Sequence, residues 1–369
     1  MKNTSKCLLA AGLILALLWV ASSGSGEEAT KALKGRVYHL QKPNLTLLQR
    51  FDWAWEEFKS LREGEYYLTG YSFESRQEVN LHGDCYKLTD SYKVKLKEGE
   101  ITISRKGETG KHFRMDEGTE PVGIIFLHKI SKKSTPIIDA DIIDFDNTYE
   151  FKETPLFWLG SVDNDKSISF LESMIEDGNP ELQKKVVFVG SLHNSPKVYD
   201  FLKRVALGNY RYKVRKNAIF WLGTLEDKNS IKYLKDISKK VKNTKLREQI
   251  VFAFQMSDEK EAIVELIKMA KTDDNQEVRE NAIFWLGQKA SKECVKALKE
   301  VVEESEDVDL KNKAVFAISQ LPPNKAVPML IDIAKTNKSP SVRKKAIFWL
   351  GQTGDEQALK FFTEILLKK

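Results

Sequence analysis

Apolar residues in the C-terminal part of the chain recur at helical spacing inside a repeating unit. The hexapeptide Ala-Ile-Phe-Trp-Leu-Gly occurs at 218–223, 282–287 and 346–351, in two steps of 64 residues (282 − 218 and 346 − 282). Weaker copies lie halfway between, at 250–255 and 314–319, so the unit is 32 residues long. A fixed period in this range is typical of a solenoid, in which each unit packs on its neighbours.

Each unit has the pattern of two helices joined by a polar turn. Val214, Ala218, Trp221 and Leu222 fall on one stripe of a first helix, and 230–241 repeats the pattern in a second helix. Seven units are predicted over 151–369. We expect the large or small residue of each first helix, and the glycine that follows, to form the structural core of the repeats: Trp158, Phe188, Trp221, Ala253, Trp285, Ala317 and Trp349, with Gly223, Gly287 and Gly351.

The second helices alternate in antiphase with the tryptophan column. Units with tryptophan carry lysine or threonine at the facing positions, and units with alanine carry apolar residues. Such a surface would suit an acidic or amphipathic segment of a partner protein, although the lysines can also be read as ordinary solvated residues. The candidate partner-binding residues are Lys232, Lys235, Val264, Ile267, Lys296, Lys299, Ile331 and Lys360.

The N-terminal half has a different pattern. Residues 45–61 carry apolar side chains at helical spacing, and 66–73 is an aromatic, β-prone segment. Alternation over 92–96 and 101–104 predicts a hairpin, and the apolar run 122–127 predicts a buried strand. Residues 27–41 show no period and are expected to be a linker. We therefore predict an α+β domain over 27–150, with one helix and antiparallel strands.

Metal and cofactor sites are not expected. His82 and Cys85 are three residues apart, but zinc needs four convergent ligands and no second close pair occurs. Four aspartates between 139 and 146 lack the regular spacing and the glycine of a calcium loop, so a solvated edge or connector is expected there. The repeat half has a single histidine, His193, and phosphate-binding glycine motifs are absent from the sequence.

The first 26 residues have the layout of a secretory signal. Lys2 and Lys6 precede an uncharged apolar run over 7–20, and small residues follow over 21–26. We expect cleavage at 21–26, export to the periplasm or the extracellular space, and no integral membrane segment in the mature chain. Retention as an N-terminal anchor is the alternative. Cys85 and Cys294 fall in different domains and are expected to be separate thiols rather than a disulfide.

Composition narrows the class of partner. Apolar residues make up 41% of the sequence and charged residues 30%, as in soluble globular proteins. The net charge of +6 falls to +4 (6 − 2) when Lys2 and Lys6 are removed. Spread over so long a chain, this charge does not indicate nucleic-acid binding.

The repeats also resemble a known family. The segments VRKNAIFWLGTLEDKNSIKYL (214–234) and VRKKAIFWLGQTGDEQAL (342–359) resemble HEAT repeats, in particular the short type named after phycocyanobilin lyase subunits. Residues 150–369 are similar to a group of exported bacterial HEAT-repeat proteins of unknown role. The resemblance implies a mainly α protein whose solenoid binds protein partners along its second helices, and it implies no catalytic residues.

These observations predict a non-catalytic interaction scaffold in the cell envelope, without a cofactor and not an enzyme. An enzyme or enzyme subunit of the lyase-like kind is the alternative. Deoxyhypusine hydroxylase has a similar fold, but its diiron site needs His-Glu pairs, and this sequence has no His-Glu dipeptide. In a third interpretation, the first domain is the binding module and the solenoid is a spacer.

Overall fold

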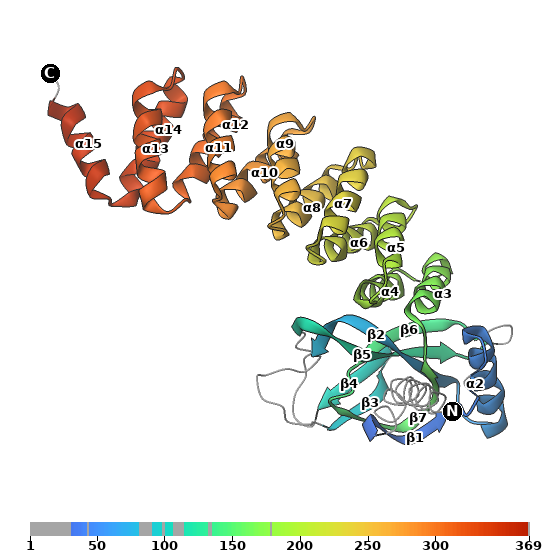
Figure 1. Cartoon of the computed structure of the whole chain (residues 1–369). Coiled ribbons are helices and arrows are strands. Elements are labelled where there is room, and N and C mark those ends of the chain that lie inside the picture. Colours follow the sequence, from blue (N-terminus) through green and yellow to red (C-terminus); the bar gives the residue numbers. More distant parts are fainter. Residues whose placement is uncertain are drawn as a thin grey trace, which may run out of the picture. The chain divides into compact units, whose positions relative to one another are not determined.

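The computed structural model describes residues 31–42, 44–80, 91–97, 100–105, 114–131, 135–177 and 179–367 (Figure 1). The chain divides into two compact units, Met1–Phe201 and Leu202–Lys369, here called the first and the second unit. The expected boundary at 150/151 falls inside a strand and is corrected accordingly. The first unit therefore contains a sheet together with the helices that follow it directly.

Seven strands form one sheet in the described part of the first unit. Their order is β4-β3-β7-β2-β5-β6, and β1 pairs with β7 outside this path. The strands are β1 (Leu33–His39), β2 (Tyr66–Asn80), β3 (Ser91–Lys97), β4 (Glu100–Arg105), β5 (Arg114–Lys129), β6 (Ile137–Ile143) and β7 (Thr148–Ser161). The predicted β3–β4 hairpin and the buried strand β5 are confirmed.

The linker and the purely antiparallel sheet were wrong predictions. Residues 33–39 are strand β1, and β1, β2 and β3 all pair with β7 in parallel. Both errors have the same cause. β7 extends past the expected boundary, and its partners lie far away in the sequence, so no local alternation reveals the pairing.

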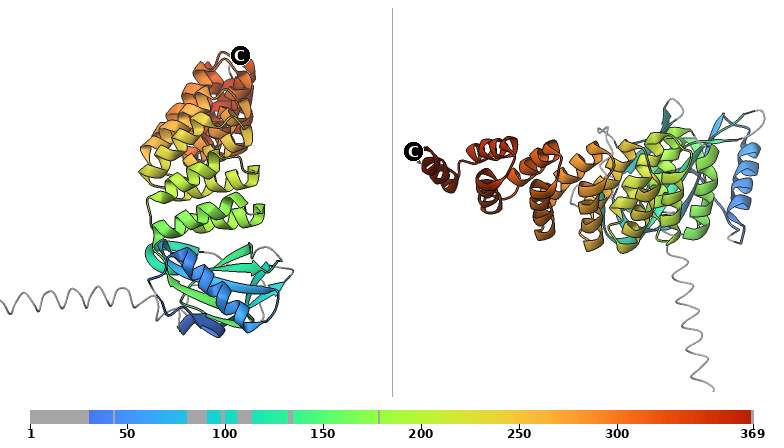
Figure 2. Two further views of the ribbon diagram at one scale, coloured as in Figure 1. Left: turned by 90° about the vertical axis from the view of Figure 1, so that its right-hand side faces the viewer. Right: turned by 90° about the horizontal axis from the view of Figure 1, so that it is seen from above.

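Three helices lie on one face of the sheet. The first is α2 (Leu47–Leu61), which begins at a capping box of Thr46 and Gln49. Side chains on one side of β2 meet these helices: Tyr67 stacks on Phe58 of α2 with ring centroids 4.7 Å apart. The other two helices are α3 (Asn164–Asp177) and α4 (Pro180–Leu192), which both contact β2 (Figure 2).

The opposite face of the sheet encloses an apolar cluster. The sheet curls, so that the Ile101 N–H of β4 donates to Asp139 Oδ2 of β6 over 2.8 Å. Trp158 lies in this cluster, almost fully buried, and meets Phe145 edge-on at 5.9 Å. Two of the aspartates that were expected at a solvated edge, Asp139 and Asp144, are instead buried. Asp144 accepts hydrogen bonds from Asn147 and Tyr149.

The placement of Trp158 corrects the repeat prediction. Trp158 and the following Gly160 were expected in the first repeat helix, but both belong to β7. Gly160 has φ +81°, a left-handed conformation that no α-helical residue adopts. The first helix of the array is instead α3, which is followed by six helix pairs that begin at α4.

The repeat helices continue through α5 (Lys197–Leu207), which crosses the division between the units, and then make up the described second unit. First helices α6, α8, α10, α12 and α14 pack in succession, and the second helices form a parallel layer (Figure 1). The fold class, a mainly α repeat array with a smaller α+β part, is confirmed. The helices are α6 (Tyr212–Thr224), α7 (Lys228–Lys240), α8 (Thr244–Met256), α9 (Lys260–Thr272), α10 (Gln276–Lys289), α11 (Lys292–Glu304), α12 (Val308–Ser319), α13 (Pro323–Thr336), α14 (Pro340–Thr353) and α15 (Glu356–Leu367).

Candidate functional site

Close approach of first helices explains the glycine column. A Cβ on Gly223 would lie 2.8 Å from Ala253 Cβ, and one on Gly287 would lie 3.0 Å from Ala317 Cβ. Each glycine therefore fits against the alanine of the next first helix, and a side chain at either position would force the helices apart. Gly351 is different, because nothing lies within 4 Å of its Cβ position.

The tryptophans lie nearer the surface than the core assignment implies. Trp221, Trp285 and Trp349 are half-buried, as is Phe188 in α4. Two of the rings contact phenylalanines of the preceding first helix: Trp285 meets Phe252 at 5.3 Å, and Trp349 meets Phe316 at 5.1 Å. Within this column the tryptophans are thus partly exposed, whereas the alanines that alternate with them, Ala253 and Ala317, are buried.

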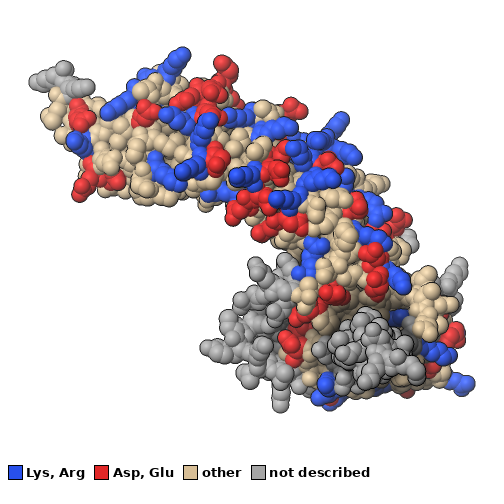
Figure 3. Space-filling model, viewed as in Figure 1, with Lys and Arg blue, Asp and Glu red and all other residues tan. Residues whose placement is uncertain are grey.

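Inter-repeat ion pairs occupy several of the candidate lysines on the second helices. Lys235 Nζ lies 2.7 Å from Glu265 Oε1 of the next repeat, and this hydrogen bond raises the lysine pKa. Lys299 reaches Asp332 of the next repeat at 3.7 Å. Acidic and basic residues accordingly alternate over the face of the second unit in view in Figure 3. The basic ladder predicted from the sequence is therefore partly neutralised by the array itself, at Lys235 and Lys299.

The remaining candidates differ in exposure. Lys232, Lys296 and Lys360 are exposed, and Val264 is an exposed apolar residue on α9. Ile267 and Ile331 are half-buried. These side chains come from α7, α9, α11, α13 and α15, so the array spreads most of them along its length.

Two of the candidates meet in a pocket between α11 and α13. It has a volume of about 410 Å³ and includes Lys296 and Lys299. Lys292 and Lys325 also line it, and Val295 and Met329 supply apolar surface. The sequence pattern pointed to the α11 lysines, but it missed Lys325 and Met329, which come from the facing helix.

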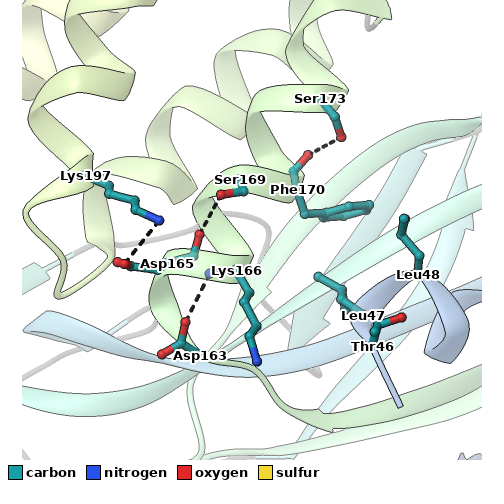
Figure 4. Close-up of a pocket in the computed structure, with 10 residues that line it drawn as sticks. All are labelled: Thr46, Leu47, Leu48, Asp163, Asp165, Lys166, Ser169, Phe170, Ser173 and Lys197. Atoms are coloured by element: carbon teal, nitrogen blue, oxygen red, sulfur yellow. Dashed lines mark hydrogen bonds and ion pairs between the residues drawn. The ribbon is translucent and has the colours of Figure 1, made fainter.

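A larger groove lies in the first unit between α2 and α3. Figure 4 shows Leu47 and Leu48 of α2 facing Phe170 of α3 across a pocket of about 650 Å³. Its rim is polar: Lys197 Nζ pairs with Asp165 at 3.2 Å, and Asp163 accepts from the main-chain N–H of Lys166. Equal numbers of aspartates and lysines make the rim electrically balanced.

The groove continues into a second pocket of about 430 Å³. The two pockets share Leu48, Phe170 and Ser173, and the second reaches Tyr67 and His128 on the sheet. We call this continuous feature the α2–α3 groove. The sequence did not predict this groove. It predicted only the amphipathic helix that carries Leu48, and the structure shows this leucine to be largely exposed.

Two histidines are buried in the described part of the first unit, and both are held neutral. Burial lowers the pKa of His128 to about 4 and that of His193 to about 3. His193 Nδ1 donates to the Val189 carbonyl, so its Nε2 accepts from Ser167 Oγ at 2.6 Å. Ser167 in turn lies 2.8 Å from the hydroxyl of Tyr71, whose pKa is raised by burial.

This Tyr71–Ser167–His193 network joins β2 to α3 and to the end of α4. Ser167 and His193 are fully buried, and neither lines the pockets described above. Phe73 stacks on the imidazole with centroids 3.8 Å apart. The arrangement fixes repeat helices to the sheet and leaves no room for a substrate beside the serine.

The described residues also bear on metal ligation and membrane insertion. In the part of the chain that the structure describes, no group of three or more His, Cys, Asp or Glu side chains could hold a metal ion. Likewise, no described helix is both long and apolar enough to span a bilayer. Cys294 is a free, buried thiol, whereas Cys85, His82 and the expected leader 1–26 lie outside the described residues.

Comparison with known proteins identifies the repeats. The HEAT-repeat profile matches residues 205–287, 263–335 and 295–369, so this part of the chain is a HEAT-repeat array. HEAT repeats are typical protein-interaction modules and suggest an interaction or scaffold role. No curated protein matches the sequence.

Solved structures with similar helix arrays include two enzyme-related proteins. Human deoxyhypusine hydroxylase is 16% identical, with 55% of this chain and 79% of that chain aligned and a TM-score of 0.26. The CpcE–CpcF complex of phycocyanin lyase from Nostoc is 17% identical over 54% and 80% of the chains, with a TM-score of 0.30. The Escherichia coli protein YibA is 19% identical over 56% and 77%, with a TM-score of 0.34.

These structures correct the prediction that the chain is not an enzyme. A hydroxylase and a lyase both carry helix arrays of this type, so the array itself gives no ground for excluding catalysis. At such low identities the likeness concerns the fold alone and assigns no activity to this chain.

Proposed function

We propose that the HEAT array binds an acidic, partly apolar segment of a partner protein at the pocket between α11 and α13. The observation that carries the proposal is the lining of that pocket. Lys292, Lys296 and Lys325 line it together with Val295 and Met329, so its apolar surface lies among lysine side chains. An amphipathic acidic segment satisfies both, since its carboxylates meet ammonium groups while its apolar side chains leave water.

The geometry of the two helices supports an extended contact. Lys292, Lys296 and Lys299 are spaced four and three residues apart on α11 and therefore share one stripe. Lys325 and Met329 are four residues apart on α13 and face that stripe across the pocket. A segment lying between the helices would contact both rows.

A synthetic peptide tests the proposal directly. The probe is a labelled amphipathic peptide of glutamate and leucine, and its control has lysine in place of glutamate. We expect fluorescence anisotropy to detect binding of the glutamate peptide only, with affinity falling as salt is added. Reversing both charges in Lys292→Glu/Lys296→Glu should weaken binding at least about tenfold.

The matched control reverses two exposed lysines on first helices, Lys213→Glu/Lys344→Glu. It makes the same change in net charge and should leave the affinity within about twofold, because neither residue lines the pocket. Equal weakening by both double variants would mean that only net charge matters and would refute a localised site. Binding of the lysine peptide as tightly as the glutamate peptide would do the same.

The α2–α3 groove favours a second function, ligand binding by the first unit. Its apolar walls and balanced rim suit an uncharged apolar ligand rather than an ion. The uncharged solvatochromic dye Nile red should fluoresce on the whole chain and lose most of that signal in Leu48→Glu. Val264→Glu, at an exposed apolar position of the second unit, should keep it; a signal unchanged in Leu48→Glu excludes the groove.

We also propose where the protein acts in the cell. The leader pattern of residues 1–26 supports export, with binding outside the cytoplasm. The mass and N-terminal sequence of the chain recovered from cell fractions test this. Recovery of an intact N-terminus in the cytoplasm would refute export without affecting the proposed binding site.

A further inference from the structure

The α2–α3 groove follows the length of two helices. The first turns of α2 and α3 line its larger pocket, where Leu47 and Lys166 lie (Figure 4). Later turns of the same helices line its smaller pocket, where Trp55 and Met174 lie. From Thr46 to Trp55 the groove spans about 14 Å, at about 1.5 Å per residue. This is the length of an extended alkyl chain of about twelve carbons, since C–C bonds are about 1.5 Å long.

The groove is apolar where its two pockets join. Leu48 and Phe170 line both pockets, and Leu48 is 67% exposed. Ser173 lies at the same junction, but its hydroxyl donates to the Phe170 carbonyl at 2.7 Å and so needs no partner from a ligand. An alkyl chain that crosses the junction would therefore remove apolar surface from water without stripping a polar group of its partner.

Charged side chains disfavour an anion at both ends of the groove. The rim of the larger pocket has two aspartates and two lysines, and Lys197 pairs with Asp165 at 3.2 Å. In the smaller pocket, Asp52 is the only charged side chain among the described residues that line it, because His128 is neutral. A carboxylate or phosphate would gain no net attraction at the first end and would be repelled at the second.

The polar groups of the smaller pocket suit hydroxyl groups. Tyr67 and Thr135 line this pocket with Asp52, and their side chains hydrogen-bond to each other. Both hydroxyls can donate and accept, and the carboxylate can accept. His128 is already satisfied, since its Nδ1 donates to the Thr135 carbonyl at 3.3 Å and its Nε2 accepts from Thr69 at 2.8 Å. A head that bears hydroxyls can therefore bind here without bringing a charge.

We propose that the α2–α3 groove binds a single-chain amphiphile with an uncharged, hydroxyl-bearing head, of the monoacylglycerol class. The chain lies along α2 and α3 over Leu48 and Phe170, and the head meets Asp52, Tyr67 and Thr135. This binding rests on the ligand binding proposed above for the groove, and it specifies the length of the ligand and the chemistry of its head.

Displacement of Nile red from the whole chain tests the class of ligand, with each competitor below its critical micelle concentration. Dodecanoylglycerol should displace the dye, and dodecanoate should bind at least about tenfold more weakly. Octanoylglycerol should also bind at least about tenfold more weakly, because each buried methylene is worth up to about fourfold in affinity. Equal binding of dodecanoate, or tighter binding of dodecylamine, overturns the uncharged head. Equal binding of octanoylglycerol overturns the extended chain.

Neutralising Asp52 tests where the head binds. Asp52→Asn should strengthen the binding of dodecanoate and lower the preference for the glycerol head to less than about threefold. The matched control is Glu57→Gln, at an exposed acid of the same helix that lines neither pocket, and it should leave the preference within about twofold. A preference that both variants lower equally reflects the charge of the whole helix and refutes head binding at Asp52.

A bulky side chain at the junction tests whether one chain occupies both pockets. Ser173→Trp should reduce the affinity for dodecanoylglycerol to that for octanoylglycerol, because the indole separates the pockets. Ser60→Trp is the matched control and should change neither affinity. Both serines are exposed on helices, and each donates to a carbonyl three residues earlier, so the two substitutions place the same strain on folding. Unchanged binding of dodecanoylglycerol to Ser173→Trp overturns the extended chain.

Nile red itself distinguishes this inference from the broader proposal. If the dye does not bind to the whole chain, or binds equally to Leu48→Glu, ligand binding by the groove is refuted. If the dye binds in the groove and dodecanoate displaces it as well as dodecanoylglycerol does, ligand binding stands and the hydroxyl-bearing amphiphile is overturned.

Discussion

The two units of this chain place their polar groups differently. The first unit buries polar side chains inside its sheet and helices, as in the Tyr71–Ser167–His193 network and in the contact of Thr69 with His128. The second unit keeps charges at the edges between repeats. Its buried carboxylates, Glu265 and Asp273, are each paired with a cation.

The difference follows from how each unit is connected. Strands of the first unit pair with partners far away in sequence, and buried hydrogen bonds fix helices to particular places on the sheet. In the second unit each helix pair contacts its immediate neighbours, so the same small set of contacts recurs. The stability of the first unit should therefore depend on its buried hydrogen-bonded side chains, and that of the second unit on the contacts between neighbouring repeats.

Acidification should produce the largest separation between the units. The pKa values of His128 and His193 are about 4 and about 3 in the folded chain, below the ordinary 6.5. Between about pH 6.5 and those values the unfolded chain binds more protons, so stability falls as pH falls. At about pH 5 each histidine should cost the first unit about 2 kcal/mol.

The second unit contains no histidine and should keep its stability over the same range. Hydrogen exchange at about pH 7 and about pH 5, corrected for intrinsic exchange rates, measures both units in one sample. The double variant His128→Asn/His193→Asn should remove most of the pH dependence of the first unit. Equal acid loss in both units would contradict the comparison.

A buried ion pair should give the next largest effect, this time confined to the second unit. Asp273 is almost fully buried and accepts two hydrogen bonds from Arg247 Nε, at 3.1 and 3.3 Å. The same guanidinium donates to the Val241 carbonyl, so it links successive repeats. Asp273→Ala should cost about 3 kcal/mol, because it leaves a half-buried arginine unpaired.

Asp332→Ala is the matched control. Its carboxylate is half-exposed and lies 3.7 Å from Lys299, so the loss should stay below about 1 kcal/mol. Urea unfolding followed by circular dichroism measures both variants. If the exposed pair proves as costly as the buried one, the recurring edge ion pairs contribute more than their solvation suggests.

Glycine packing should give the smallest effect and the most local one. Gly223→Val places a side chain against Ala253 Cβ and Cα, at 2.8 and 2.9 Å, and should destabilise the array by about 2 kcal/mol. Gly351→Val, measured at high dilution, should change stability by less than about 0.5 kcal/mol. Thermal unfolding of the two variants compares identical substitutions in the same hexapeptide, and equal losses would contradict the packing assignment.

Repeat periodicity predicted most of the second unit. It was wrong at the start of the expected array, which lies in the first unit. Phe-Trp-Leu-Gly occurs at 157–160, 220–223, 284–287 and 348–351, and the first copy is a strand while the others are helices. Pro155 disfavours a helix just before the first copy, and Gly160 closes it with a positive φ. Pairing with β1 and β2 then determines the strand, through partners that the local pattern does not contain.

The candidate site was predictable only in part for a related reason. The alternation between second helices made Lys296 and Lys299 candidate binding residues, and both line the pocket between α11 and α13. The facing residues Lys325 and Met329 depend on how two helices pack, and the α2–α3 groove joins residues more than a hundred positions apart. Neither arrangement leaves a periodic trace in the sequence.

The fit of Gly223 on Ala253, and of Gly287 on Ala317, restricts how this chain can change in length. A unit of the tryptophan type must be followed by a unit of the alanine type, because a Cβ on Gly223 would already lie 2.8 Å from Ala253 Cβ and so leaves no room for an indole there. Deleting one 32-residue unit would bring two tryptophan types together, whereas deleting 64 residues would restore the original fit. Duplication and loss in such a gene should therefore proceed by pairs of units.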